Sequence, residues 1–177
     1  GISKKLISRH THLFGDDTAL TAEEGLDTWT RNKKLERNYE KTSQMLTDVP
    51  RSMPALMRAA KLQKRAGKIG FDWPSPVGAR EKMLEELTEL EQELSRRELA
   101  AIPSLDKEVE RAIQSEAGDL LFALVNFLRL NQIEPESALT ASSENFIRRF
   151  RSMEEIAAEN GIDLDSGLSL EVLDSFW

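Results

Sequence analysis

The sequence EAGDLLFALVNFLRL, residues Glu116–Leu130, decides the fold of this chain. Apolar side chains recur at helical spacing in its first half, and from residue 120 onward nearly every position is apolar. A helix that is apolar all round lies in a protein core or in an oligomer interface. Asp119 opens this apolar run, and an acid in such a place is rarely left without a partner. The stretch therefore predicts a central helix that carries a partnered acid at its edge.

A second helical segment, which contains EELTE (Glu85–Glu89), carries acids at matching angles. The apolar stripe of this segment consists of Met83, Leu87, Leu90 and Leu94. In the segment around Glu116 the corresponding stripe consists of Ile113, Ala117, Leu120 and Leu124. At about 100° per residue, Glu86 and Glu89 lie roughly 60° and 120° to one side of their stripe. Glu116 and Asp119 lie roughly 60° and 120° to the same side of theirs. Two such helices packed antiparallel would bring four carboxylates to one side of their seam.

Four neighbouring carboxylates without a counter-ion would repel one another and take up protons. A divalent cation removes this repulsion, and ligation by carboxylate oxygens with room for water suits Mg²⁺, with Mn²⁺ as a second possibility. The alternative is a solvated surface, because Glu-Glu-x-x-Glu is common on exposed helix faces. The second acid pair favours the metal site, since it borders a segment that must be buried.

The composition limits the classes of protein to be considered. The 177 residues suffice for one core-bearing domain with extensions, and 40% hydrophobic with 31% charged residues is typical of a soluble globular protein. No apolar run reaches the length of about 20 residues that spans a bilayer, and no signal-peptide pattern opens the chain. A chain without cysteine is compatible with a cytoplasmic location. The net charge of −7 argues against general nucleic-acid binding.

The pattern of apolar residues predicts helices throughout, so we expect an all-α helical bundle around the two acid-bearing helices. A capping box at Thr21 and Glu24 opens a charged helix that runs to about residue 41. The run TDVPRSMP breaks it and separates an extension, residues 1–50, from a main domain, residues 51–177. Within the main domain we expect helices over about 54–69, 77–99, 105–131, 134–160 and 170–177.

The loop after the first of these helices contains two aromatic residues, Phe71 and Trp73. Either they anchor the loop in the core, or they form a platform on which a nucleobase stacks. The residues alone leave both possibilities open.

The order of motifs resembles the MazG-type nucleoside triphosphate pyrophosphohydrolases. The matching stretches are PALMRAAKLQKRAGKIGFDW from Pro54, Lys82 with Glu85, Glu86 and Glu89, EAGDLLFALVNFLR from Glu116, EPESAL, and FIRRF from Phe146. They cover about the last 125 residues in the order of the family. The segment KLISRHTHLFGD also resembles the end of the N-terminal domain in two-domain members. The chain is therefore expected to be either the C-terminal half of a longer two-domain protein, with the connection that precedes it, or a natural product of truncation.

The resemblance implies an all-α fold in which Glu86, Glu89, Glu116 and Asp119 hold Mg²⁺, with Glu85 adjacent. It also implies hydrolysis of nucleoside triphosphates between the α- and β-phosphates, with broad or house-cleaning specificity. Family members form dimers or larger oligomers, so a homodimer is expected. Two features depart from the family pattern. Ser143 and Asn145 stand where the family commonly has Asn and a phosphate-binding Lys, and 30 positions separate Glu86 from Glu116.

For catalysis, the bound metal would bridge phosphate oxygens and orient a water, and Glu85 or Glu89 would accept the proton of that water. A phosphate clamp could be drawn from Lys61, Lys64, Lys82, Arg148 and Arg149, while Trp73 is the candidate contact for the base. Two rivals remain at this stage. The chain could be a non-catalytic dimerisation or regulatory module with a structural metal, or another all-α pyrophosphohydrolase that acts on a deoxyuridine or phosphoribosyl nucleotide.

Overall fold

The structure, a computed structural model, describes residues 1–15, 21, 24–25, 28, 32, 41–99 and 107–177. The chain divides into two compact units, Gly1–Pro50 and Arg51–Trp177. In the first unit lie α1 (Ile2–Arg9), α2 (Thr11–Phe14) and α4 (Thr42–Thr47). The second unit contains α5 (Ala55–Gly67), α6 (Pro76–Leu99), α7 (Lys107–Leu130), α8 (Pro135–Glu159), the 3₁₀ turn η2 (Leu164–Ser166) and α9 (Leu170–Asp174).

The described part of the chain is helical and contains no strand, which confirms the all-α class. The predicted helices of the main domain are observed, with ends that differ by a few residues from the expected ones. The capping box is also confirmed, because Glu24 N donates to Thr21 Oγ1 and Thr21 N donates to Glu24 Oε2, both at 3.2 Å. Most of the helix expected after it lies outside the described residues. No helix in the described ranges is long and apolar enough to cross a membrane.

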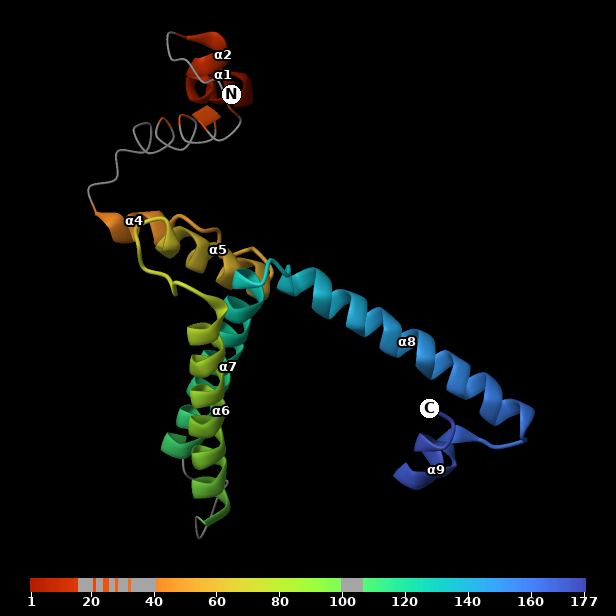
Figure 1. The fold of residues 1–177 in the computed structure, drawn as a ribbon. Helices are drawn as coiled ribbons and strands as arrows, with labels where there is room; N and C mark the ends of the chain where they lie inside the picture. The colour runs from red at the N-terminus through yellow and green to blue at the C-terminus, as the bar shows by residue number, and fades with distance from the viewer. Residues whose placement is uncertain (16–20, 22–23, 26–27, 29–31, 33–40, 100–106) are drawn as a thin grey trace. The chain divides into compact units, whose positions relative to one another are not determined.

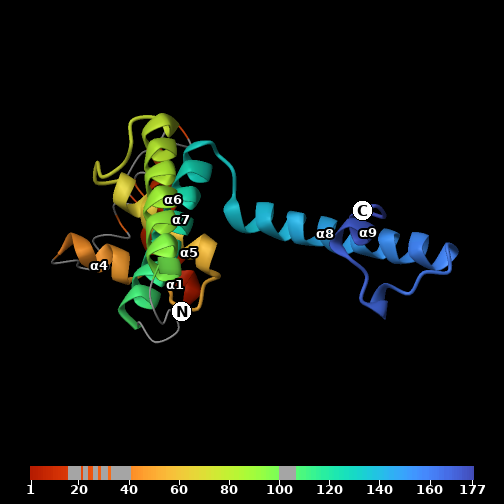
Figure 2. The same ribbon diagram turned by 90° about the horizontal axis from the view of Figure 1, so that it is seen from below.

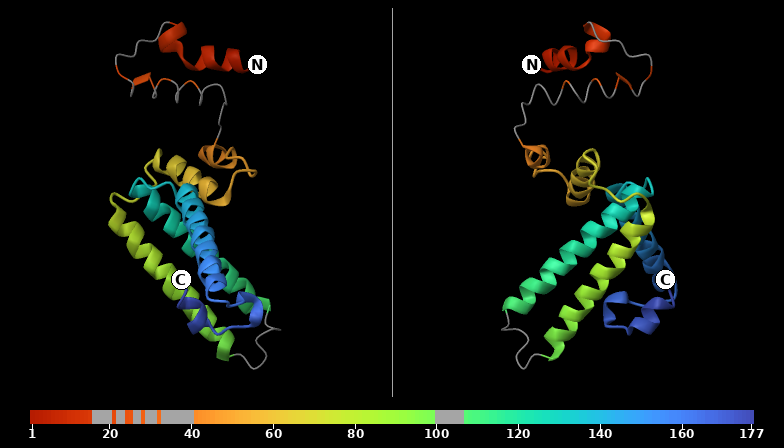
Figure 3. Two further views of the ribbon diagram at one scale, coloured as in Figure 1. Left: turned by 90° about the vertical axis from the view of Figure 1, so that its right-hand side faces the viewer. Right: turned by 60° about the vertical axis from the view of Figure 1, so that its left-hand side comes forward.

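The helices α6 and α7 form an antiparallel pair that organises the second unit, as Figures 1 and 3 show. The same pair lies side by side in Figure 2. Ala79 of α6 and Val109, Ala123 and Val125 of α7 are buried. The helix α5 packs against α7, where the buried Gln63 donates from Nε2 to the carbonyl oxygen of Phe122 at 2.8 Å. Because this carbonyl has a second lone pair, it can accept the bond without breaking the helix.

The helix α8 has clear start and stop signals. Its N-cap, Glu134, accepts hydrogen bonds from the backbone of Glu136 and Ser137, and Pro135 occupies the first helical position, where no N–H is required. At the other end, Gly161 adopts a φ of 69°, and Ile162 N donates to the Ala157 oxygen at 2.9 Å. This left-handed glycine lets the chain satisfy the last carbonyls and turn back.

Several predicted core positions are only partly covered within the single chain. Leu87 of α6 and Leu124 of α7, which belong to the two apolar stripes, are exposed by 40% and 36%. The prediction that these positions are buried is therefore wrong for the isolated chain, because the described helices leave one side of each without a neighbour. Phe71 is exposed by 81% and does not anchor its loop in the core.

Candidate functional site

Three of the four predicted acids meet at the seam between α6 and α7. Glu86 comes from α6, and Glu116 and Asp119 come from α7, where their spacing of three residues places them on one side of the helix. One carboxylate oxygen from each lies within 4.8 Å of the others. Glu86 is buried, Glu116 is half-buried and Asp119 is exposed, so the cluster opens from the seam toward solvent. We call these three residues the acid cluster.

Glu89, the fourth predicted acid, is not a member of the acid cluster. Partial burial and the neighbouring charges of Glu86, Glu85 and Glu116 raise the pKa of Glu89 above its ordinary value, against the opposing effect of Lys82. The carboxyl of Glu89 is thus electrostatically coupled to the cluster. A carboxyl with a raised pKa is a stronger proton acceptor than an ordinary one.

Lys82 connects two of the predicted acids. Its Nζ lies 2.7 Å from Oε1 of Glu85 and 2.7 Å from Oε1 of Glu86. Hydrogen bonds to these two carboxylates raise the pKa of Lys82 further above its ordinary value. Lys82 therefore neutralises part of the negative charge on α6 and fixes the direction of the Glu86 side chain.

The acid cluster has the chemistry of a divalent-cation site. Its donors are all carboxylate oxygens and they converge on one point, and Lys82, which contacts Glu86, balances only one of the three negative charges. Hard oxygen donors of this kind suit Mg²⁺ and Mn²⁺. The residues present thus fit a bound cation.

The aromatic loop between α5 and α6 is held in place from α7. Arg129 Nη2 lies 2.5 Å from Asp72 Oδ1, and the same carboxylate oxygen accepts from Trp73 N at 2.9 Å. Asn126 Oδ1 in turn accepts from Nη2 and Nε of Arg129, at 2.6 and 3.1 Å. This role of Arg129 and Asn126 was not predicted from the sequence. Polar residues inside the apolar run of α7 were the available signal.

Trp73 lies against a glycine of α6. A Cβ built on Gly78 would come within 2.5 Å of Trp73 Cε3, so only glycine allows this approach. The side chain of Trp73 is nonetheless 44% exposed. One side of the indole is thus supported by α6 while other parts remain accessible, which is the arrangement that a stacking platform requires.

Among the described residues, the other lysines and arginines predicted to bind phosphate do not contact the acid cluster. Lys61 and Lys64 are exposed on α5. On α8, Arg148 Nη2 donates to Asn145 Oδ1 at 3.2 Å, and the guanidinium of Arg149 lies 6.0 Å from the ring centroid of Trp177. The position of the expected lysine thus carries an amide that binds an arginine instead.

The chain is similar over nearly its full length to known pyrophosphohydrolases. It is 39% identical over 176 residues to the nucleoside triphosphate pyrophosphohydrolase of Escherichia coli (strain K12), covering 99% of this chain and 63% of that protein. It is 36% identical over 176 residues to the nucleoside triphosphate pyrophosphohydrolase/pyrophosphatase MazG of Thermotoga maritima, covering 99% of this chain and 61% of that protein.

The YabN protein of Bacillus subtilis (strain 168), which is described as uncharacterized, is 42% identical over all 177 residues of this chain and 34% of its own length. No family model matches the chain. The two named pyrophosphohydrolases confirm the resemblance to MazG-type nucleoside triphosphate pyrophosphohydrolases that the motifs indicated. The chain spans somewhat less than two thirds of the length of these relatives.

Proposed function

We propose that residues 51–177 form a catalytic domain that hydrolyses nucleoside triphosphates between the α- and β-phosphates, and that residues 1–50 form an inter-domain connection. The products are a nucleoside monophosphate and pyrophosphate. The observation that carries this proposal is the convergence of Glu86, Glu116 and Asp119, in a chain similar to two named pyrophosphohydrolases. Broad or house-cleaning specificity and a cytoplasmic location belong to the same proposal.

Glu86, Glu116 and Asp119 are the residues proposed to hold Mg²⁺, with Mn²⁺ as a substitute, and Glu89 is a further candidate ligand. A cation bound there would neutralise charge on the phosphate oxygens and polarise the phosphoryl group. The three carboxylates would hold such a cation at the seam, with the buried Glu86 as the ligand on the side of the core.

Glu89 is the stronger candidate for the general base. Its raised pKa makes it a better proton acceptor, whereas Glu85 is half-exposed and hydrogen-bonded to Lys82. A carboxylate oxygen of Glu89 would take the proton from the attacking water, and Lys82 would keep Glu85 and Glu86 in place. Glu85 remains the alternative base.

The phosphates would be bound by cations from several helices. Lys61, Lys64, Lys82, Arg148 and Arg149 are the candidates, and arginine is suited to two-pronged contact with phosphate. Asn145 cannot supply the charge of the expected lysine, but its hydrogen bond to Arg148 orients a guanidinium one turn away. This contact supports a role for Arg148 as the substitute cation.

Replacement of Trp73 by alanine tests the stacking platform. We expect the KM for a nucleoside triphosphate to rise by about tenfold or more while kcat changes little, because base stacking contributes about 1–3 kcal/mol. Phe71→Ala is the comparison, because Phe71 lies in the same loop and is 81% exposed, and a similar rise of KM in this variant would assign the platform to both rings. Steady-state kinetics of both variants make the comparison. Equal KM values for the Trp73 variant and the unmodified chain would rule out the platform.

A second copy of the chain is the proposed cover for the apolar face of α8. Leu139, Phe146 and Phe150 share a stripe with Met153 and Ala157 by helical spacing. Met153 and Ala157 are buried, whereas Leu139, Phe146 and Phe150 are exposed by 57%, 58% and 41%. The uncovered end of this stripe supports a homodimer, as does the exposed Leu121 of α7.

The substitution Leu139→Glu tests whether this stripe of α8 is the dimer interface. We expect Leu139→Glu to convert dimers to monomers in light scattering, because the charge would be buried without a partner on association. Ala141→Glu adds the same charge on the opposite face of the helix and should leave the dimer intact. A dimer that persists in the Leu139 variant would show that this stripe is not the interface.

A non-catalytic regulatory module is the alternative. The similarity to two proteins named as pyrophosphohydrolases favours the enzyme. The test is incubation of the chain with a panel of nucleoside and deoxynucleoside triphosphates, with and without Mg²⁺, followed by separation of pyrophosphate from orthophosphate. We expect Mg²⁺-dependent monophosphate and pyrophosphate. A folded chain that hydrolyses no nucleotide would instead support the module.

A further inference from the structure

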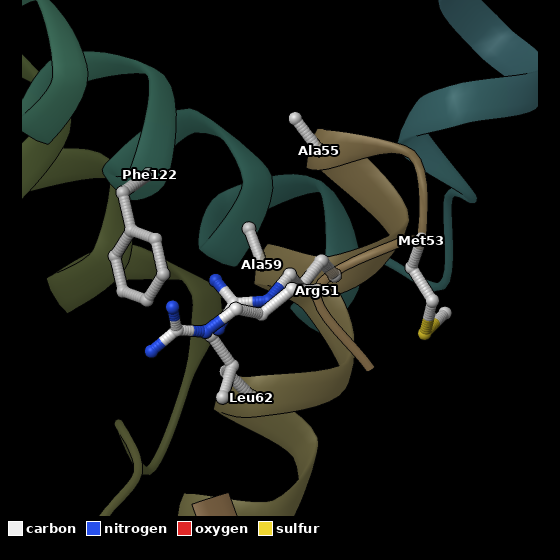
Figure 4. Close-up of a pocket in the computed structure, with 7 residues that line it drawn as sticks. Arg51, Met53, Ala55, Ala59, Leu62 and Phe122 are labelled. Carbon is white, nitrogen blue, oxygen red and sulfur yellow. The ribbon is translucent and has the colours of Figure 1, made fainter. Parts of the chain in front are cut away.

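A pocket outside the acid cluster lies where α5 and the segment before it approach α7. Its volume is about 590 Å³, which is within the range of small-molecule sites. Figure 4 shows Phe122 reaching toward the pocket from α7, opposite Ala59 and Leu62 of α5. The lining residues are Arg51, Met53, Ala55, Arg58, Ala59, Leu62 and Phe122.

The charge of this pocket is positive. Arg51 and Arg58 contribute two guanidinium groups, and none of the seven lining residues is acidic. The Nε atom of Arg58 is buried and makes no hydrogen bond to any described residue. A buried donor on a charged group without an acceptor is costly, so an anionic oxygen placed there would satisfy it. Paired guanidinium groups have the geometry and charge to bind phosphate.

The remaining walls of the pocket are apolar and include an aromatic ring. Phe122 is 44% exposed, and Met53 and Leu62 contribute further apolar surface. An inorganic phosphate would use the arginines and leave this surface uncovered. A phosphate joined to a planar heteroaromatic group would use both, because a base can stack on a phenyl ring.

The pocket is close to the acid cluster but differs from it in charge. Phe122 follows Asp119 by three residues, which is a rise of about 4.5 Å along α7. Without a metal the acid cluster repels phosphate, whereas the two arginines attract it. The two neighbouring sites can therefore be separated experimentally by removing divalent cations.

We propose that the pocket of Arg51, Arg58 and Phe122 is a second binding site, which takes a nucleoside monophosphate with its phosphate on the arginines and its base on Phe122. The proposal concerns binding and goes beyond the hydrolysis proposed above. If that hydrolysis occurs, this ligand is of the same class as its product.

The test is calorimetric titration of the full chain with AMP, and separately with inorganic phosphate, in EDTA. We expect AMP to bind more tightly than phosphate. Arg58→Ala should weaken the binding of both by about tenfold or more, because a hydrogen-bonded charge pair is lost. Arg111→Ala is the matched control, since it removes the same charge from an exposed site on α7 and should leave both affinities unchanged.

Two further variants test where the nucleobase of AMP binds. Phe122→Ala should reduce the affinity for AMP to that for phosphate without changing the latter, while Trp73→Ala should change neither. Circular dichroism establishes that each variant is folded. The proposal is overturned if neither probe binds in EDTA, if Arg58→Ala and Arg111→Ala weaken binding equally, or if AMP binds no more tightly than phosphate. Because no metal is present, these outcomes are independent of whether the chain hydrolyses triphosphates.

Discussion

Asp119→Asn is expected to lower kcat for nucleoside triphosphate hydrolysis by about 10³-fold. The substitution keeps the shape of the side chain but removes one of the three charges of the acid cluster. Metal stabilisation of phosphoryl-transfer charge is worth several kcal/mol, and about 4 kcal/mol corresponds to this factor. Because Asp119 is exposed, the helix content and the thermal midpoint should not fall.

Glu110→Gln provides the matched control for this experiment. Glu110 lies on the same helix and is exposed, and its Oε1 is 3.8 Å from Arg97 Nη1. A surface ion pair of this kind contributes little to stability, so the control variant should retain full activity. Similar activity of the Asp119 variant and the control would show that Asp119 does not hold a catalytic cation.

Glu89→Gln is expected to lower kcat by about 10²–10⁴-fold, the usual contribution of a general base. Glu85→Gln should have a much smaller effect, because Glu85 is bound to Lys82 and more exposed. The opposite order of effects would assign the base to Glu85. Steady-state kinetics at saturating substrate compare the two variants.

The free energy of unfolding of the metal-free protein gives an independent test of Glu89. Burial and the neighbouring carboxylates raise the pKa of Glu89, so between the unfolded and the folded pKa the folded chain binds more protons than the unfolded chain. The contribution of this group to stability is therefore present at low pH and is lost as the pH rises through the folded pKa. At pH 7 the metal-free Glu89→Gln variant should be slightly more stable than the unmodified chain. This difference in stability should disappear on acidification.

The spacing of residues predicted much of the fold and the centre of the candidate site. Three-residue spacing on α7 sets the directions of Glu116 and Asp119, and the matching pattern on α6 places Glu86 opposite them. These are local consequences of helix geometry. The start of α8 at Glu134 and its end before Gly161 likewise follow from caps that can be read in the sequence.

The features that the sequence did not reveal depend on contacts between distant residues. The bond between Arg129 and Asp72 joins positions 57 residues apart, and although a polar residue in the apolar run of α7 signals some role for Arg129, no local pattern identifies Asp72 as its partner. The exclusion of Glu89 from the acid cluster depends on how far α6 is rotated toward α7, which helical periodicity alone does not fix. The exposure of Leu87 and Leu124 shows that an apolar stripe predicts a covered face without identifying what covers it.

The binding of Mn²⁺ to the full chain, followed by the electron paramagnetic resonance signal of the free ion, tests most directly whether the acid cluster is a cation site. We expect the unmodified chain to bind Mn²⁺, Asp119→Asn to bind it at least about tenfold more weakly, and Glu110→Gln to bind it normally. Equal Mn²⁺ binding by all three proteins, or no binding by the unmodified chain, would contradict the assignment of Glu86, Glu116 and Asp119 as metal ligands.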